Sequence, residues 1–250
     1  MSARIIAVSN RKGGTAKTTT AVNLAAALGA RGRRVLVVDL DTQGHAGLGF
    51  GVRAGMGEAT VHDLFRRGAS LEGALRRTAY PAIDVLPADR TFEGATEAAP
   101  LDLARALAPL TSGYDAVVID TSPAADALLV AALAAADPVI VPTLLHHLAV
   151  DGVGQFARSY FRVASALNPR LKGLSLLPVQ VDLRVTMQRE THDQLTARFG
   201  AARLLDGIRT DVSLAEAFGR QQPVKYYKPK TRAVTDFESL CDQVSTTIIY

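Results

Sequence analysis

Short apolar runs alternate along this chain with longer segments in which apolar residues recur at helical spacing. Runs such as Ile5-Ile6-Ala7-Val8 and Val35-Leu36-Val37-Val38 are continuously apolar, which is typical of parallel strands covered on both faces. The pattern predicts strands near residues 4–9, 34–39, 83–86, 115–120, 138–142 and 174–181. It predicts helices near residues 17–30, 100–109, 124–135, 151–166, 187–199 and 232–247. Strands that alternate with helices indicate an α/β fold, in which helices cover both faces of a mostly parallel sheet.

The length and composition are consistent with one folded unit. A chain of 250 residues that is 48% hydrophobic is able to bury one substantial core, so we expect a single domain over residues 1–250. No linker rich in Pro, Ser or Gly divides the sequence, and no internal repeat is visible. Residues 44–70 have the least regular pattern, and we expect a mobile loop and short helices there.

A glycine-bearing loop follows the first predicted strand and leads into the first predicted helix. Its sequence is Lys12-Gly13-Gly14-Thr15-Ala16-Lys17-Thr18-Thr19. Such a loop points unpaired backbone N–H groups and the positive end of the helix dipole at one spot, where an anion binds. Lys17 supplies a charge for β- and γ-phosphates, and Thr18 supplies a hydroxyl for Mg²⁺. The strict phosphate-loop pattern is not met, because Arg11 and Ala16 stand where its two glycines belong.

Three carboxylates follow predicted strands at positions that a parallel sheet brings to one edge. Asp39 ends the second strand, Asp41 follows it closely, and Asp120 ends the strand over residues 115–120. A single Asp at the end of a strand is often only a helix N-cap. Three such residues beside a lysine-bearing loop favour a shared site at the carboxyl ends of the strands, where open α/β sheets bind ligands.

These motifs resemble those of the ParA/MinD family of ATPases. Residues 12–19 are similar to that family's deviant Walker A motif, which carries two lysines. Residues 39–44 resemble its second motif, and residues 117–123 resemble its Walker B region. Residues 208–217 and 222–224 resemble the stretch around the nucleotide base and the dimer face. The resemblance covers nearly the whole chain and implies a P-loop NTPase fold of three layers, α/β/α, that hydrolyses ATP to ADP and phosphate.

The resemblance also implies roles for individual residues, with ATP and Mg²⁺ as cofactors. Lys17 would hold the β- and γ-phosphates, Lys12 would cross to the partner subunit's nucleotide in an ATP-bound homodimer, and Asp41 would position the attacking water. Thr18 would ligate Mg²⁺, Asp120 would orient the water shell of the metal, and Asp39 would lie nearby. The implied nucleotide-binding set is Lys12, Gly13, Gly14, Thr15, Ala16, Lys17, Thr18, Thr19, Ile208, Arg209 and Asp211.

Three residues depart from the family's pattern. Ala16 replaces a glycine, and its methyl group crowds the loop, which we nevertheless expect to survive. Thr42 replaces a proline and His45 replaces an asparagine, so we expect the rate of hydrolysis to be altered more than nucleotide binding. For His45, a solvated loop histidine is favoured over a catalytic base.

The net charge of +4 lies entirely in residues 151–250, because residues 1–150 hold equal numbers of basic and acidic side chains. Basic residues with interleaved aromatic residues suit a phosphate backbone. The densest cluster is Arg220, Lys225, Lys228, Lys230 and Arg232. Together with the resemblance to ParA, this cluster predicts nonspecific DNA binding; the alternative is a solvated loop before the last helix. No helix-turn-helix pattern is visible, so we do not expect sequence-specific binding.

The single cysteine, Cys241, excludes internal disulfides and suits a reducing cytoplasm. It also cannot supply the paired thiolates of the nitrogenase iron-protein relatives. The sequence shows no signal peptide and no apolar run of the roughly 20 residues that a membrane span needs.

We therefore predict a ParA-type ATPase, cytoplasmic and nucleoid-associated, whose ATP-bound dimer coats DNA. A ParB-like or adaptor protein on the cargo would stimulate hydrolysis, and the cargo is a plasmid or chromosome, or a protein assembly such as a carboxysome. A MinD-like ATPase on membranes is one alternative, but residues 237–250 carry no Lys or Arg and predict no stable membrane anchor. A small-molecule synthetase of the same fold is the other; against it stand the position of Lys12 and the lack of an evident substrate-binding set.

Overall fold

The computed structural model describes residues 3–93, 99–123 and 126–247, and within these ranges all strands belong to one sheet. The eight strands are β1 (Arg4–Val8), β2 (Val35–Asp39), β3 (Arg76–Arg77), β4 (Ile83–Leu86), β5 (Ala116–Asp120), β6 (Pro138–Leu144), β7 (Gly173–Val181) and β8 (Ile208–Arg209). Their order across the sheet is β3-β4-β2-β5-β1-β6-β7-β8. All neighbouring pairs are parallel except β3 and β4, so the predicted mostly parallel sheet is confirmed.

The central strands are buried on both faces, which explains their continuous apolar sequences. Every residue of β2 and every residue of β5 is buried. β5 lies between β1 and β2, and this order places the ends of three strands side by side. In the register, Val8 of β1 and Asp39 of β2 both pair with Asp120 of β5. The phosphate loop therefore starts at the same edge of the sheet at which the two carboxylates lie.

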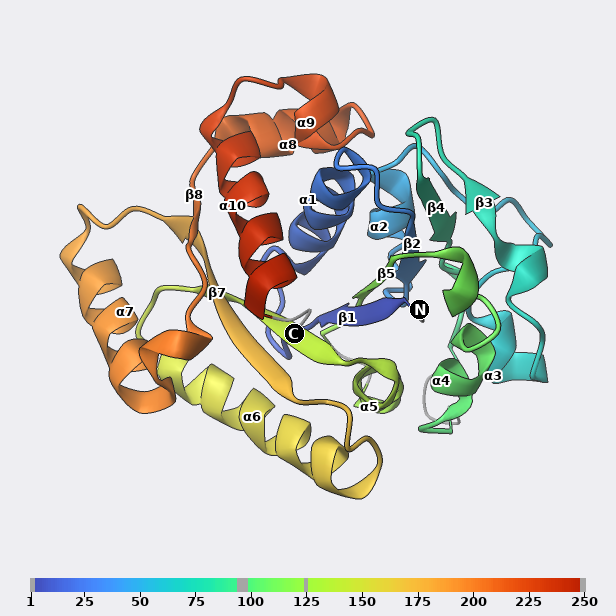
Figure 1. Cartoon of the computed structure of the whole chain (residues 1–250), viewed down its shortest axis with the longest axis horizontal. Helices are drawn as coiled ribbons and strands as arrows, with labels where there is room; N and C mark the ends of the chain where they lie inside the picture. Colours follow the sequence, from blue (N-terminus) through green and yellow to red (C-terminus); the bar gives the residue numbers. More distant parts are fainter. Residues whose placement is uncertain (1–2, 94–98, 124–125, 248–250) are drawn as a thin grey trace.

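Helices cover both faces of the sheet and give the molecule three layers (Figure 1). One face packs against α1 (Lys17–Gly29), α2 (His45–Leu48), α8 (Val212–Gly219), α9 (Val224–Tyr227) and α10 (Arg232–Thr247). The other packs against α3 (Asp63–Arg67), α4 (Asp102–Leu107), α5 (Asp126–Ala135) and α6 (Ala149–Ala166), with α7 (Thr186–Phe199) against α6. The α/β/α architecture predicted from the sequence is thus observed.

The predicted long elements are found with bounds that differ by three residues or fewer, apart from 124–125, which lie outside the described residues. Residues 44–70 contain the expected short helices, α2 and α3. The sequence pattern missed β3, β8, α8 and α9. β3 and β8 have two residues each, and α9 has four, too few to show a periodicity. α8 has eight residues and forms part of the wall of a cavity described below.

The last helix, α10, is held in the core through its apolar face. Val234, Phe237, Leu240 and Val244 of this helix are each at most 5% exposed and belong to the same cluster as the residues of α1. On the same helix Thr235 and Asp242 are exposed, whereas Asp236 is buried and bonds to Arg209. Among the described helices, none is long and apolar enough to cross a membrane.

Candidate functional site

The loop after β1 is shaped by one buried side chain, Asn10. Its Nδ2 donates to the carbonyl of Pro142 at 2.8 Å, and its Oδ1 accepts from the backbone N–H of Lys12 at 3.0 Å. Asn10 therefore ties the loop to the end of β6. We did not identify this residue from the sequence, where an isolated Asn before a basic residue carries no signal of its partner more than 130 residues away.

The backbone turns twice through left-handed conformations before α1 begins. Gly14 has φ of 71°, and Ala16 has φ of 59° and ψ of 29°. No side chain caps the first turn of α1. The helix therefore presents its first N–H groups and its positive dipole end toward the loop, which is the arrangement that binds phosphate. For Ala16, the sequence suggested crowding by the methyl group; the structure adds a backbone conformation that alanine rarely adopts.

Lys17 lies inside this loop. Its side chain is buried, and Nζ donates to the carbonyl of Lys12 at 3.0 Å. Burial lowers the pKa of Lys17, while the charges of Asp120 and Asp41 raise it. An ammonium group with a single carbonyl partner and two nearby carboxylates is well placed to turn to the phosphates of a nucleotide.

Two buried carboxylates lie beside this lysine at the ends of neighbouring strands. Asp39 and Asp120 are fully buried and are partners in the register of β2 and β5. Oδ2 of Asp39 accepts from the N–H of Gly47 at 2.8 Å, and Oδ2 of Asp120 accepts from the hydroxyl of Thr18 at 2.7 Å. Within the described part of the chain, the other carboxylate oxygen of each residue has no hydrogen-bond partner.

Burial strongly disfavours the charge on this pair. It raises the pKa of Asp120 to about 7 and the pKa of Asp39 well above its usual range, and the neighbouring carboxylate raises that of Asp39 further. Two unpartnered carboxylate oxygens and a threonine hydroxyl form the hard oxygen set that Mg²⁺ prefers. Among the residues described, no three acidic or histidine side chains converge on one point. That also fits Mg²⁺, which takes one or two carboxylates and completes its shell with waters and phosphates.

Asp41 lies at the same edge but is less buried. Its Oδ1 accepts from the N–H of Gln43 at 3.0 Å, and its charge acts on Lys17, Asp39 and Asp120. The structure therefore places the three predicted carboxylates around the loop. His45, at the start of α2, is exposed, and its ring lies edge-on to Phe218 with centroids 5.7 Å apart. That position agrees with a solvated histidine, although the residue belongs to a short helix.

A cavity of about 440 Å³ opens beside the start of α1. The three tail residues predicted from the family resemblance, Ile208, Arg209 and Asp211, line it together with Ala16 and Thr19 of the loop. Such a volume falls in the range of small-molecule sites. The structure thus brings the predicted base-binding residues to the loop, where an adenine ring would lie next to bound phosphates.

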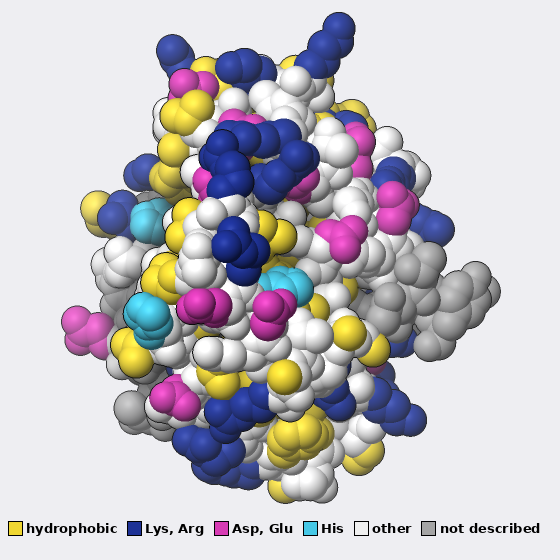
Figure 2. Space-filling model, turned by 90° about the vertical axis from the view of Figure 1, so that its left-hand side faces the viewer, with side chains coloured by type: hydrophobic (Ala, Val, Ile, Leu, Met, Phe, Trp, Pro, Cys, Tyr) yellow, Lys and Arg dark blue, Asp and Glu magenta, His cyan; other side chains and the backbone are white. Residues whose placement is uncertain are grey.

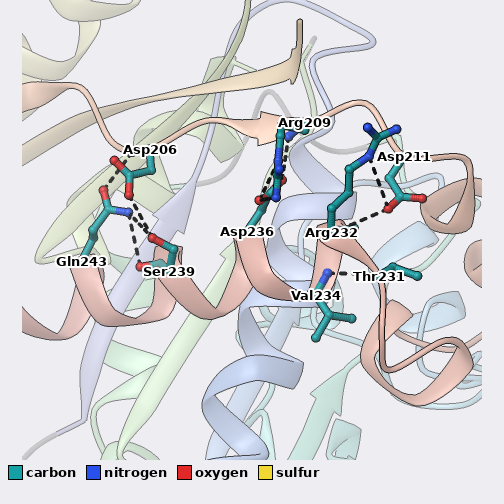
Figure 3. A network of polar contacts seen from close by, with 10 residues as sticks. Asp206, Arg209, Asp211, Thr231, Arg232, Val234, Asp236, Ser239 and Gln243 are labelled. Atoms are coloured by element: carbon teal, nitrogen blue, oxygen red, sulfur yellow. Dashed lines mark hydrogen bonds and ion pairs between the residues drawn. The ribbon is translucent and has the colours of Figure 1, made fainter.

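The charged side chains of this cavity are already engaged by α10 (Figure 3). Arg209 makes a bidentate ion pair with Asp236, with Nη2–Oδ1 at 2.6 Å and Nε–Oδ2 at 3.1 Å. Asp211 caps α8 by accepting from the N–H of Ser213 at 2.9 Å. Both side chains therefore form part of the wall of the cavity, which Ile208 and residues such as Leu214 and Phe218 also line. Gln180, which also lines it, has a φ of 54° and was not predicted.

Asp39 lines a second cavity, of about 650 Å³. The segment 43–60 and the turn after β4 form it, and its lining includes Gln43, His45, Arg53 and Arg90. Nothing in the sequence indicated this cavity, because its walls come from the irregular region between α2 and α3.

The predicted DNA-binding residues lie between the end of α8 and the start of α10, at the end of the molecule that carries α8 and α9 (Figure 1). Lys and Arg side chains are exposed at this end in Figure 2. Two of them have acidic neighbours: Lys225 Nζ is 2.6 Å from Glu238 Oε1, and Arg232 Nε is 3.8 Å from Asp211 Oδ2. Arg220, Lys228 and Lys230 are exposed and make no ion pair with any residue of the described ranges. These three are the cations best placed for a phosphate backbone. Arg158 and Arg162 are exposed on α6, which lies at the opposite end of the molecule in Figure 1. Basic side chains also gather at that end in Figure 2.

Lys12, the second lysine of the loop, is exposed rather than directed into it. Its Nζ lies 2.8 Å from Nε2 of His146, which follows β6. The two lysines of the motif therefore point to different places, Lys17 into the loop and Lys12 toward the surface.

Comparisons with known proteins agree with this geometry. A family model described as an AAA domain matches residues 3–173. The chromosome-partitioning ATPase Soj of Thermus thermophilus is 38% identical over 96% of this chain and 95% of its own. The chromosome partitioning protein ParA of Caulobacter vibrioides is 33% identical over 96% and 93%, respectively. A solved structure from Mycobacterium smegmatis, named cobyrinic acid a,c-diamide synthase and containing ADP and magnesium, has a TM-score of 0.82 at 34% identity, over 96% of this chain and 93% of that one.

The left-handed conformation of Ala16 yields a prediction. We expect Ala16→Gly to raise the free energy of unfolding by about 1 kcal/mol, because glycine adopts this conformation without the steric cost that alanine bears. Urea unfolding followed by circular dichroism measures the change. Ala82→Gly is the matched control, because Ala82 has a φ of 65° in an exposed turn. This substitution should raise the free energy of unfolding by a similar amount and leave ATP hydrolysis unchanged. No gain at position 16, with a gain at position 82, would contradict the assignment of strain to the loop.

Proposed function

We propose that this chain, which belongs to the ParA/Soj family of partition ATPases, closes into a homodimer around two ATP molecules and positions a cargo on DNA. Membership of this family makes the chain an ATPase. The ATP-bound dimer, the DNA surface and the cargo are the further elements of the proposal.

The different directions of the two loop lysines carry the proposal. Lys17 is buried at the start of α1, beside Asp120 and Thr18, where it would reach the phosphates of its own nucleotide. Lys12 is exposed on the outer side of the same loop. From there it would reach the nucleotide of a facing subunit, where it would act like an arginine finger. An enzyme that completed its site alone would have no need of this second cation.

Each residue of the site would have its own role in hydrolysis. Lys17 and the N–H groups of α1 would bind the phosphates, and the cavity at Ile208 would hold the base. Thr18, Asp39 and Asp120 would hold Mg²⁺, which supplies positive charge to the phosphates when it is bound. Asp41 would orient the attacking water, and the partner's lysine would stabilise the charge that develops on the transferred phosphoryl group.

DNA binding is assigned to the exposed cations Arg220, Lys228 and Lys230, with Lys225 and Arg232 beside them. A dimer carries the patch twice, and affinity for DNA rises steeply with the number of phosphates neutralised. ATP would thus switch DNA binding on through dimer formation, and hydrolysis would switch it off.

The Soj and ParA relatives favour a chromosome as the cargo, because both are named as chromosome-partitioning proteins. A plasmid is the related alternative. A cargo-bound ParB-like partner would stimulate hydrolysis and release the dimer from DNA. We place the protein in the cytoplasm, on the nucleoid. A protein assembly such as a carboxysome is the less supported cargo.

The MinD-like alternative requires an amphipathic helix with a free apolar face. The apolar face of α10 is instead buried against α1, through residues such as Phe237 and Leu240. A membrane role would therefore require another segment, and we rank it below DNA binding.

The synthetase alternative is supported by two observations, the name of the Mycobacterium smegmatis relative and the cavity of about 650 Å³ beside Asp39. Amide synthesis would need a carboxylate substrate and a nitrogen donor, and the arginines of that cavity, Arg53 and Arg90, are suited to a carboxylate. ATP turnover that depends on a small carboxylic acid and ammonia, and is indifferent to DNA, would favour the synthetase.

The role of Asp41 generates a prediction. Asp41→Ala should retain ATP binding and lose most of the hydrolysis rate, so that the dimer accumulates with ATP. Light scattering measures the dimer, and phosphate release measures turnover. His45→Ala is the control, since we expect only a small change in turnover when that exposed histidine is removed. Normal turnover by Asp41→Ala would rule out the catalytic assignment.

The proposed DNA-binding surface leads to a second prediction. Charge reversal by Lys228→Glu with Lys230→Glu should weaken binding of the ATP-bound protein to nonspecific duplex by about tenfold or more and reduce its salt dependence. Arg158→Glu with Arg162→Glu makes the same change of charge on α6. Fluorescence anisotropy at several salt concentrations compares the DNA affinity of the two double variants. Loss of binding only in the α6 variant would place the DNA on that helix.

A further inference from the structure

The contact between Lys12 and His146 joins the catalytic loop to the start of α6. Nζ of Lys12 lies 2.8 Å from Nε2 of His146, a hydrogen-bonding distance. His146 is half-buried between β6 and α6, whereas the lysine approaches from the exposed loop. Lys12 is thus held by an uncharged ring rather than by a carboxylate.

His146 makes a second contact that competes with the first. The N–H of Leu148, at the start of α6, donates to Nδ1 of His146 at 3.1 Å. A neutral imidazole carries one hydrogen and one lone pair. If Nδ1 accepts from Leu148, then Nε2 carries the hydrogen and faces the N–H groups of a charged lysine. If Nε2 accepts from Lys12, then Nδ1 carries the hydrogen and faces the N–H of Leu148.

The two hydrogen bonds therefore exclude each other in every protonation state in which Lys12 is charged. An imidazolium has no lone pair for either donor, and it would add a second positive charge next to Lys12. His146 is able either to accept from Lys12 or to accept from the N–H of Leu148, but not both at once.

We propose that His146 is a positioning residue that holds Lys12 in the nucleotide-free subunit and releases it by exchanging tautomers when the dimer forms. This inference rests on the proposed function of Lys12 as the residue that crosses to the partner's nucleotide. In the holding state, Nε2 accepts from Lys12. In the released state, Nε2 carries the hydrogen and Nδ1 accepts from the N–H of Leu148.

The exchange of tautomers lowers the free-energy cost of releasing Lys12. When Lys12 leaves, His146 recovers a hydrogen bond to an N–H group that has no partner inside the helix. A carboxylate in place of the imidazole would lose an ion pair and gain nothing comparable. His146 thus keeps Lys12 away from its own subunit's phosphates without trapping it there.

The surroundings keep the imidazole neutral. Burial lowers the pKa of His146, and the charges of Lys12 and His147 lower it further. Among the described residues these are the titratable groups that act on it by charge. The positive end of the α6 dipole also disfavours an imidazolium at this place.

Nitrogen-15 spectroscopy of the histidine ring in the nucleotide-free protein tests the proposal directly. The wild type should show His146 with the hydrogen on Nδ1, and Lys12→Ala should shift it to Nε2. The ATP-bound Asp41→Ala dimer should show the same shift as Lys12→Ala. Assignment comes from His146→Phe, which removes the resonance. A hydrogen on Nε2 in the wild type, or one tautomer in all three samples, would overturn the proposal.

Dimerisation kinetics supply an independent test. His146→Phe keeps a ring but removes both nitrogens, so ATP-dependent dimer formation should be faster by about fivefold, as expected for the loss of one hydrogen bond. His146→Glu should hold Lys12 by an ion pair and slow it. His147→Phe is the matched control, because His147 is exposed and should leave the rate unchanged. Equal rates for all three variants would contradict a holding role.

The two tests separate this inference from the proposed function. A tautomer shift in Lys12→Ala without any ATP-dependent dimer would support the holding contact and refute the dimer. A normal dimer without a tautomer shift would support the dimer and refute the role of His146.

Discussion

The pairing of β2 with β5 is the constraint on which the site depends. It sets Asp39 opposite Asp120 at the buried edge of the sheet, next to the loop that follows β1. Burial makes both carboxylates resist ionisation, as the raised pKa of each residue indicates, and the charge of Asp120 adds to the effect on Asp39. Hydrogen bonds from Gly47 and Thr18 favour the ionised forms, and positive charge brought to this point favours them further. Lys17 supplies part of it, and a divalent cation bound with the nucleotide would supply the rest.

The loop gains its shape from the same sheet. Asn10 ties it to the end of β6, and Gly14 and Ala16 turn the chain into α1 through left-handed conformations. Because α1 is buried along most of its length, the core holds in place the helix whose start would face the phosphates. The nucleotide would therefore meet preorganised N–H groups, and the freedom left in the site belongs mainly to Lys12 and to Asp41, the less buried residues.

Much of this arrangement could be predicted from the sequence, because it depends on local patterns. Continuous apolar runs identified the central strands, and their last residues, Asp39 and Asp120, followed from the rule that parallel strands end at a common edge. Long-range contacts could not be predicted in this way. The partners of Asn10, Arg209 and His146 lie far away in the sequence or depend on the exact entry of a helix. The ion pairing of the basic cluster could not be predicted either, because Glu238, which neutralises Lys225, lies on a different helix.

The central claim is that Lys12 acts on the nucleotide of a second subunit, and mixing two inactive variants tests it most directly. Lys12→Ala lacks the crossing lysine, and Asp41→Ala lacks the water-orienting carboxylate. In a mixed dimer, the Lys12→Ala subunit keeps its own Asp41 and receives Lys12 from its partner, so one complete site is restored. The account predicts that each variant alone is nearly inactive and that the mixture, combined before ATP is added, recovers ATP hydrolysis. A mixture no more active than its separate components, although the mixed dimer is shown to form, would contradict it.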